Sequence, residues 1–382
     1  MNPLFWFFTV TALVWMYRSR LALKTLDTAP VVRPSPALEE QNELVSVIIP
    51  AKNEEKNIEF CVNSLLNQDY AKFEIIVIND NSTDRTETIL RNLGAEAPSL
   101  RGRMKYMNAP ETPPGWTGKN FAIHTGVAEA RGNWLLFTDA DTRHEPSSIR
   151  ASMQHVLSRD IAFLTLLPRC LVKSFWEYLI QPCAMALIGL WFPLERVNHP
   201  RSSVYFANGQ YLLIQKNLYR KLGGHESVKE AYLEDFALMK KSKQSGSHTQ
   251  CAFGMDVYGT RMYDSFAGIW KGWRRIFLHA FERKPAPLVG KTISLVAFSV
   301  LPYLFLIPLT RLALTLPEQY GFLWGASLVL LIFILGTAWK AYSIVRAKRL
   351  FALLYPLAAF IVSIILLDAT WMALTKKATT WR

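Results

Sequence analysis

The sequence has few cysteines, and they form no pattern. Its 382 residues include four, Cys61, Cys170, Cys183 and Cys251, without the paired spacing of a zinc site or the density of a disulfide-held fold. We therefore expect reduced thiols that behave as small buried apolar side chains. The seven histidines are also scattered, with no pair spaced for metal binding as in His-Glu-x-x-His.

Several motifs of nucleotide-dependent and hydrolytic enzymes are absent as well. No Gly-x-Gly-x-x-Gly turn follows the first apolar strand, which argues against a dehydrogenase with a dinucleotide fold. Lys119 follows Gly118, but the spacing is not that of a Walker loop, so ATP hydrolysis is not indicated. No Ser-His-Asp or Cys-His arrangement is evident, so we expect no covalent enzyme nucleophile.

Acidic residues are in the minority. The chain has 30 acidic and 43 basic side chains, which gives a formal net charge of +13. The basic residues collect beside apolar runs, as at Lys271, Arg274 and Arg275, and this distribution is typical of the edges of a bilayer and of contact with anionic headgroups. We expect a membrane as the partner and no nucleic acid.

Long apolar runs lie at both ends of the chain. Residues 1–17 carry no charged side chain and precede Arg18, which predicts an uncleaved N-terminal membrane anchor, and the proline-containing stretch 18–43 is interpreted as a linker. Each run near the C-terminus is about long enough to cross a bilayer. These C-terminal spans are expected at 292–310, 320–339 and 350–367, within a segment 286–375 that a basic tail, 376–382, follows.

Another apolar run covers residues 178–194. As a span it would place the acidic motifs before and after it on opposite sides of the membrane. We therefore expect a helix that lies in the membrane interface.

Regular structure between these runs begins with apolar strands separated by helical stretches. The strands are expected at 44–50, 74–80 and 133–139. This alternation predicts an α/β domain with a mainly parallel sheet, over residues 44–285, with ligands at the carboxyl ends of the strands.

Acidic residues follow two of these strands. Asp139 and Asp141 are two apart, so in an extended segment both carboxylates can approach one hard divalent cation, Mg2+ or Mn2+, although such a pair is also common in solvated turns and helix caps. Asp80 could accept a hydrogen bond from a base or a ribose hydroxyl. Asp84, a few residues on, is explained equally well as a helix cap.

Two further segments carry candidate chemistry. After the rigid turn at 113–117, Gly118 permits close backbone approach and Lys119 could neutralise a phosphate. The acidic pair Glu234 and Asp235 could be a negatively charged first helical turn, favoured by the helix dipole. The alternative is that the pair is catalytic, with Asp235 as a general base that removes a proton from an attacking hydroxyl.

The order of these motifs resembles that of the family 2 glycosyltransferases. The resemblance covers about residues 44–283 and rests on Ser46–Glu55, Asn79–Asp84, Asp139–Asp141 and Glu234–Asp235. It implies the GT-A fold, a nucleotide-sugar donor such as a UDP-sugar, and a single inverting displacement. It also implies that Pro50, Glu54 and Asp80 border the nucleotide. The family usually has an acid where this chain has Asn79.

Within the family, the segments 114–119, 139–142 and 261–263 look like those of hopanoid-associated and carotenoid glycosyltransferases. That likeness implies a membrane lipid acceptor of terpenoid type, with Arg261 near the diphosphate. The chain lacks the Gln-x-x-Arg-Trp of polymer-forming relatives, so we expect transfer of one sugar. Trp270 and Trp273 then either anchor the membrane interface or contact a sugar.

The resemblance leaves two other functions open. One is transfer to a polyprenyl phosphate, as in dolichyl-phosphate-mannose-type synthases, and the other is a non-catalytic membrane scaffold of the same fold. Whether the acceptor is a polyprenyl phosphate or another lipid, we expect a multi-pass protein of the inner (cytoplasmic) membrane with its catalytic domain in the cytoplasm.

Overall fold

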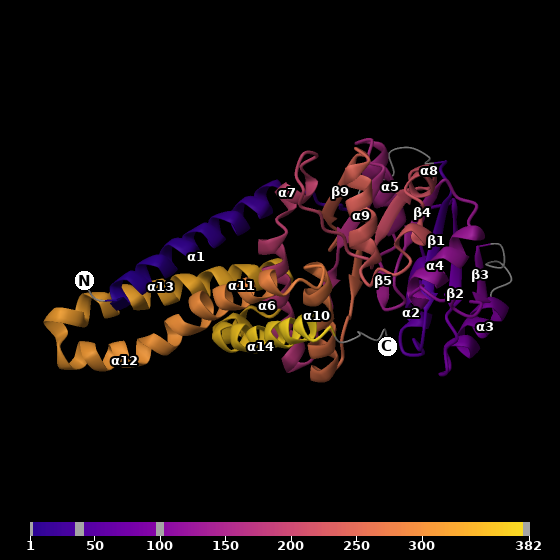
Figure 1. The fold of residues 1–382 in the computed structure, drawn as a ribbon. Helices are drawn as coiled ribbons and strands as arrows, with labels where there is room; N and C mark the ends of the chain where they lie inside the picture. Colours follow the sequence, from indigo (N-terminus) through magenta and orange to yellow (C-terminus); the bar gives the residue numbers. More distant parts are fainter. Residues whose placement is uncertain (1–2, 35–41, 97–102, 377–382) are drawn as a thin grey trace. The chain divides into compact units, whose positions relative to one another are not determined.

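The computed structural model describes residues 3–34, 42–96 and 103–376 (Figure 1). The chain divides into two compact units, and each is described here by itself. The α/β unit comprises Ala29–Leu171 and Leu194–Met262, and the helical unit comprises Met1–Thr28, Val172–Pro193 and Tyr263–Thr380.

A seven-stranded sheet forms the centre of the α/β unit. The strands β3, β2, β1 and β4 are parallel, β8 runs antiparallel to both β4 and β6, and β9 is parallel to β6. The sheet is therefore mainly parallel, as the sequence predicts. In sheet order the strands are β3 (Met104–Asn108), β2 (Phe73–Asn79), β1 (Val45–Ala51), β4 (Trp134–Phe137), β8 (Leu212–Gln215), β6 (Phe163–Leu167) and β9 (Thr249–Phe253).

Helices cover both faces of this sheet because its central strands are apolar on both sides. Along β1, Val47 and Ile49 face one hydrophobic cluster while Ile48 faces the other. Residues of α2, α3 and α5 belong to the first cluster, and residues of α4, α8, η2 and α9 to the second. The helices are α2 (Ile58–Leu66), α3 (Thr86–Glu96), α4 (Gly118–Ala128), α5 (Ser148–Leu157), α7 (Leu194–Asn198), α8 (Lys216–Lys221), η2 (His225–Val228) and α9 (Glu234–Gln244).

A second, small sheet begins with β5, the strand that follows β4 in the chain. It has the order β5 (Thr142–His144), β10 (Tyr258–Thr260) and β7 (Arg169–Cys170). These strands have two or three residues each, which is too short for a period-two pattern, so the sequence gives no sign of them. The small sheet connects the segment with Asp139 and Asp141 to the end of β10.

The helical unit contains the apolar runs. Three of its segments are long and apolar enough to cross a membrane, at Pro285–Thr315, Pro317–Ile344 and Arg349–Leu374. They contain the three runs expected from the sequence and extend beyond each of them. The helices are α1 (Pro3–Thr28), α6 (Phe175–Trp191), α10 (Phe266–Ala280), α11 (Pro285–Leu295), the π-helical η3 (Val296–Val300), α12 (Leu301–Thr315), α13 (Pro317–Ile344), η4 (Arg349–Leu354) and α14 (Tyr355–Leu374).

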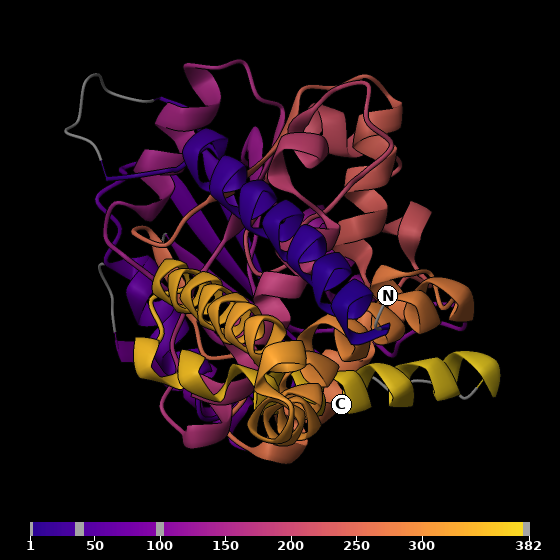
Figure 2. The same ribbon diagram turned by 90° about the vertical axis from the view of Figure 1, so that its left-hand side faces the viewer.

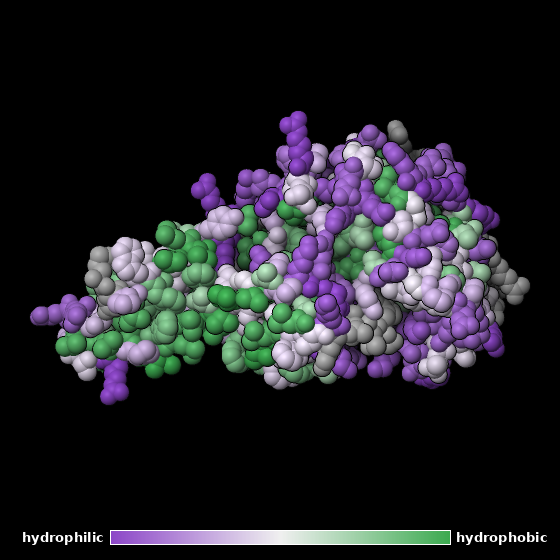
Figure 3. All heavy atoms as spheres, in the orientation of Figure 1, coloured by the Kyte–Doolittle hydropathy of each residue, from purple (hydrophilic) through white to green (hydrophobic). Residues whose placement is uncertain are grey.

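The long helices of this unit, from α1 in indigo to α14 in yellow, are seen from two directions in Figures 1 and 2. Apolar side chains cover the surface over α12 and α13, where the space-filling view is mostly green (Figure 3). Phe322, Ile307 and Leu314 are among the side chains exposed there. A water-soluble protein seldom leaves so large a contiguous apolar surface open, which indicates association with a membrane.

Three expected boundaries differ from the structure. Residues 18–28, assigned to the linker, continue helix α1 to Thr28, because this stretch is rich in Leu and Arg and no proline follows Pro3 until Pro30. Residues 35–41 of the linker lie outside the described residues. The domain 44–285 is not one compact unit, since α6 and α10 group with the helical unit.

The third difference is the start of the apolar run 178–194. Helix α6 begins at Phe175, because Ser174 and Glu177 form a capping box in which each side chain accepts a hydrogen bond from the other's backbone N–H. Glu177 is fully buried in this role. It therefore does not mark a polar end of the helix.

Candidate active site

The candidate residues lie in loops at the carboxyl ends of neighbouring parallel strands. Asp80 comes directly after β2, and Asp139 comes two residues after β4. Both strands pair with β1, so their carboxyl ends share one edge of the sheet. Lys119 lies in the first turn of α4, and Glu234 and Asp235 are the first two residues of α9. Helix dipoles and strand ends thus concentrate polar groups at one place.

Asp80 is buried against the start of α4. Its Oδ2 lies 3.2 Å from Lys52 Nζ, and the side chain is 5% exposed. A Cβ built on Gly118 would come within 2.5 Å of the same Oδ2. Only glycine leaves room for this carboxylate at the helix N-terminus, so Asp80 and Gly118 are one structural pair.

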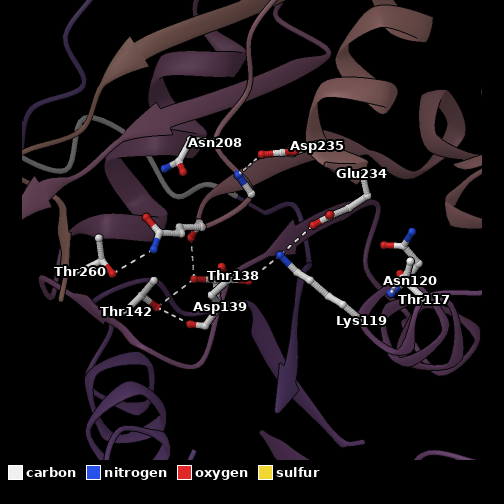
Figure 4. A network of polar contacts seen from close by, with 12 residues as sticks. Thr117, Lys119, Asn120, Thr138, Asp139, Thr142, Asn208, Glu234, Asp235 and Thr260 are labelled. Carbon is white, nitrogen blue, oxygen red and sulfur yellow. Dashed lines mark hydrogen bonds and ion pairs between the residues drawn. The ribbon is translucent and has the colours of Figure 1, made fainter. Parts of the chain in front are cut away.

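Lys119 connects two of the candidate acids (Figure 4). Its Nζ lies 2.8 Å from Asp139 Oδ1 and 2.7 Å from Glu234 Oε1, with the lysine side chain 9% exposed. Burial alone would lower the pKa of Lys119, but the two carboxylates outweigh it and hold the pKa above its ordinary range. The ammonium is therefore a fixed positive charge between β4 and α9.

Asp235 is held by backbone amides. Its Oδ2 accepts a 2.7 Å hydrogen bond from the Gly209 N–H, and its Oδ1 accepts one of 2.8 Å from Phe236. Burial and the adjacent charge of Glu234 raise the pKa of Asp235 to about 7, although Lys119 and the two amides oppose the shift. A carboxyl group poised near neutral pH in this way suits general-base catalysis.

Gly209 lies between the charged groups. A Cβ built on it would be 3.3 Å from each of Asp235 Oδ2, Glu234 Oε1 and Lys119 Nζ. The loop is fixed on one side of Gly209 by Asn208, whose Nδ2 donates to Leu166 O and to the Tyr258 hydroxyl. Sequence reasoning missed Gly209, because a lone glycine before a short strand carries no signal of its own.

A buried, uncharged network supports the segment that carries Asp139 and Asp141. The Thr142 hydroxyl donates to Asp139 O at 2.8 Å, and the Thr138 hydroxyl donates to Gln210 O at 2.8 Å. His144 Nε2 lies 3.1 Å from both hydroxyls. Since each hydroxyl proton already goes to a carbonyl, an Nε2–H donor on His144 satisfies both oxygens.

Burial keeps this histidine neutral, since it lowers the pKa of His144 to about 3. On the far side of the loop, the Thr260 hydroxyl of β10 donates to Asp141 O at 3.4 Å and accepts from Gln210 Nε2 at 3.0 Å. The sequence interpretation gave His144 little weight. The only signal for its role was its place three residues after Asp141.

Asn120 connects α4 to the segment before α9. Its Nδ2 lies 2.9–3.1 Å from the carbonyl oxygens of Val228, Lys229 and Ala231. The Thr117 N–H adds a 2.9 Å hydrogen bond to Lys229 O. These bonds fix the start of α9, and with it Glu234 and Asp235, relative to Lys119. Asn120 directly follows Lys119, the residue expected to meet a phosphate, but its contact with a segment about a hundred residues away could not be predicted from the sequence.

Of the remaining expected donor-binding residues, Pro50 and Glu54 lie at the carboxyl end of β1, whereas Arg261 follows a strand of the small sheet. Pro50 is in β1 opposite Ile78 of β2. Glu54 follows β1, and its backbone N–H donates to the Thr86 hydroxyl at the start of α3. Arg261 directly follows Thr260 of β10. Asp84 accepts hydrogen bonds from Thr86 and from Glu55 N, so the helix-cap interpretation of Asp84 is correct.

Asn79, where the family usually has an acid, has a structural role. Its Nδ2 donates to Asn108 Oδ1 at 2.7 Å, and its Oδ1 accepts from Ser82 N at 3.3 Å. An aspartate could not make the first of these bonds, because it has no donor. The amide therefore links the ends of β2 and β3 next to Asp80.

The two tryptophans left open by the sequence are used inside the helical unit. Trp270 Nε1 donates to Asp368 Oδ2 at 2.7 Å, and Arg274 donates to the same oxygen at 3.1 Å. Trp273 is buried, with 3% of its surface exposed. The contacts of Trp270 and Arg274 with Asp368 tie α10 to α14.

Comparison with known proteins gives three findings. Residues 46–223 match the model of glycosyl transferase family 2. The 4,4'-diaponeurosporenoate glycosyltransferase of Staphylococcus aureus is 27% identical over 268 residues, which cover 69% of this chain and 65% of that protein, just under two thirds of its length. A solved mannosyltransferase of Pyrobaculum calidifontis, in complex with GDP-mannose and Mn2+, is 17% identical with a TM-score of 0.56, over 98% of this chain and 100% of the other. The fold is therefore the expected GT-A fold, with candidate membrane helices.

Proposed function

We propose that the chain transfers a single sugar from a nucleotide-sugar donor, a UDP-sugar, to a membrane lipid, since residues 46–223 match the model of glycosyl transferase family 2. The transfer inverts the anomeric carbon and depends on a divalent cation. The observation that carries the proposal is the ion-pair chain from Asp139 through Lys119 to Glu234, with Asp235 next to it. It joins three segments that are far apart in the sequence.

The two acids after β4 suit a hard cation that also takes oxygen ligands from a substrate. Asp139 and Asp141 offer carboxylate oxygens, the donors that Mg2+ and Mn2+ prefer. Among the described residues no group of three or more His, Cys, Asp or Glu side chains is placed to hold a metal alone. Two carboxylates leave coordination positions for diphosphate oxygens and water, which Mg2+ usually keeps. The solved mannosyltransferase with Mn2+ is a protein of the same fold.

A bound divalent cation would supply Lewis-acid stabilisation of the departing diphosphate. The chain's own residues divide the remaining work. Lys119 offsets negative charge near Asp139, Arg261 at the end of β10 assists it, and Asp80 with Pro50 and Glu54 borders the nucleotide. Asp235 takes the proton of the acceptor hydroxyl as that oxygen attacks, and Glu234 keeps Asp235 basic by its adjacent charge.

The acceptor is proposed to be a terpenoid lipid. Two findings support it: the named activity of the Staphylococcus aureus relative and the apolar helices of the helical unit. Transfer to a polyprenyl phosphate is the second candidate. It needs little help from a base because the acceptor is already anionic, so a requirement for Asp235 discriminates between the two. The catalytic unit is proposed to lie at the cytoplasmic face of the inner membrane.

The test compares Asp235→Asn with Asp69→Asn in the full-length chain. Asp69 pairs with Arg150 at the surface of the same unit and serves as the matched control. Purified protein in detergent receives membrane lipids and a panel of nucleotide sugars, and products are identified by mass spectrometry. We expect Asp235→Asn to lose about 10²–10⁴-fold in transfer rate while nucleotide affinity is unchanged.

Full activity of Asp235→Asn on lipid alcohols would remove Asp235 from the mechanism. Activity confined to polyprenyl phosphates would move the assignment to the second candidate. Absence of product from every donor and lipid, with nucleotide binding intact, would favour the scaffold.

A further inference from the structure

The helical unit contains a cation with only neutral partners. Arg18, on α1, donates to the hydroxyls of Ser299 at 3.2 Å and Ser294 at 3.0 Å, and to Ser294 O at 3.4 Å. Tyr355 of α14 donates to the same Ser299 hydroxyl at 3.0 Å. Four elements, α1, α11, η3 and α14, therefore meet at this guanidinium.

Aromatic rings fix the orientation of Arg18. The guanidinium carbon lies 5.2 Å from the centre of the Trp15 ring and 5.9 Å from that of Phe298. The Trp15 indole in turn donates to Phe298 O at 2.6 Å. Contacts with two rings restrict the orientations of this guanidinium, so less conformational entropy is lost when it binds an oxyanion.

A second cation, Lys291, lies on α11, the helix of Ser294, and the charge of Arg18 acts on it. Its Nζ lies 5.6 Å from the centre of the Trp191 ring. Within the described ranges of the chain, no Asp or Glu forms an ion pair with Arg18 or Lys291. The acid of this unit on α14, Asp368, is paired elsewhere with Arg274. Two positive charges that no described carboxylate pairs leave this part of the helical unit short of negative charge.

The residues around Arg18 and Lys291 indicate which kind of anion would balance the two positive charges. A guanidinium taken out of water without a partner is strongly destabilising, and charged residues inside membrane segments usually mark a ligand site. On the same helix as Ser294 and Lys291, Val289 and Ile293 expose apolar side chains, 41% and 62% of their surface. An anion at this site therefore finds apolar surface beside it, as the head of a lipid does.

We propose that Arg18 and Lys291, with the hydroxyls of Ser294, Ser299 and Tyr355, bind the phosphate or carboxylate head of an anionic lipid whose chain lies along α11. The inference does not depend on the proposed sugar transfer. The shared chemistry is an oxyanion attached to an apolar chain. Its source is either a bilayer phospholipid or a free lipid acid.

Native mass spectrometry of the full-length chain tests the site. The probes are phosphatidylglycerol, phosphatidylcholine, palmitate and inorganic phosphate, each added to the protein in detergent. The variants are Arg18→Gln and Lys291→Gln, and Arg20→Gln is the matched control, because Arg20 is an exposed arginine on the same helix. Thermal unfolding with and without each probe gives a second readout, since a bound ligand raises the midpoint.

We expect the wild type to retain phosphatidylglycerol or palmitate over phosphatidylcholine. Arg18→Gln should weaken that binding at least about tenfold, as loss of a charge-assisted hydrogen bond implies, and Arg20→Gln should leave it unchanged. Lys291→Gln keeps the hydrogen bonds between α1 and η3 and still weakens binding, so the test survives if Arg18→Gln fails to fold.

Arg18-dependent binding of phosphatidylglycerol alone identifies a bilayer lipid, and of palmitate alone a free lipid acid. Both results support the proposal. Equal binding of phosphatidylcholine, equal competition by inorganic phosphate without a lipid chain, or anionic-lipid binding that neither Arg18→Gln nor Lys291→Gln changes would overturn it.

Discussion

The most specific prediction for the α/β unit concerns the charge of the Lys119 ammonium. Lys119→Met keeps an unbranched side chain of similar length and removes only the charge that lies 2.8 Å from Asp139 and 2.7 Å from Glu234. Removing one partner of a buried ion pair costs about 3–5 kcal/mol. For a unit of this size, each kcal/mol lowers the melting midpoint by about 2–4 °C, so we expect a loss of about 6–20 °C.

The loss should depend on pH with a defined sign. Lys119 lowers the pKa of Asp235, which in the intact site is about 7, so its removal raises that pKa further. For a carboxyl group whose pKa is higher in the folded than in the unfolded state, stability falls as pH rises from the unfolded to the folded pKa. In the wild type this fall ends near pH 7, and in Lys119→Met it continues above pH 7. The difference between the two proteins should therefore be larger at about pH 9 than at about pH 6.

The assay is thermal unfolding of the full-length chain in detergent, followed by tryptophan fluorescence at both pH values. Lys105→Met is the matched control, because Lys105 pairs with Glu129 at the surface of the same unit and both side chains are nearly half exposed. Such exposed pairs contribute about 0–1 kcal/mol, so its midpoint should move by no more than about 4 °C. A Lys119→Met protein that melts like Lys105→Met would refute the buried ion pair. A large loss independent of pH would attribute the effect to packing.

Three further predictions concern the same site. Gly118→Ala should raise the dissociation constant of the donor nucleotide about tenfold, because the new Cβ would come within 2.5 Å of Asp80 Oδ2. The control is Gly94→Ala on α3, whose Cβ would meet nothing within 4 Å, and it should leave the dissociation constant unchanged. Asn120→Leu should lower kcat more than it changes the KM for the donor, since it releases the segment before α9, and unchanged kcat would contradict this. The value of kcat/KM should fall about tenfold per pH unit below about pH 7, where Asp235 becomes protonated. A pH profile that is flat down to pH 5 would exclude Asp235 as the base.

The central strands could be predicted because a short apolar run buried on both faces is typical of a strand in a parallel sheet. Strands β1 and β2 are apolar runs buried on both faces, and the structure places each within a residue of the expected bounds. Strand β8 enters the sheet antiparallel between β4 and β6, and nothing in its four residues determines that neighbour. Pairings of this kind depend on contacts between distant segments, which a local pattern does not contain.

The same distinction separates the site residues that could be predicted from those that could not. Asp80 and Asp139 could be named as candidates because ligands of a mainly parallel sheet gather at the carboxyl ends of its strands. Gly209 and Asn120 were not, since their effect comes from groups they approach only in the folded chain. Glycine and asparagine are common loop residues, so their type alone carries little information.

Lys119, Asp139, Glu234 and Asp235 form one charged layer of the candidate site. Because they interact with one another, a change in any one of them alters the electrostatics of the others. The layer beneath uses hydroxyls, amides and a histidine that burial keeps neutral. Neutral groups can hold the loop of Asp139 and Asp141 in place without adding a charge that competes with Lys119. A substitution that charges this layer should therefore disturb the ionisation of Asp235 as well as the loop, whereas a neutral substitution should disturb the loop alone.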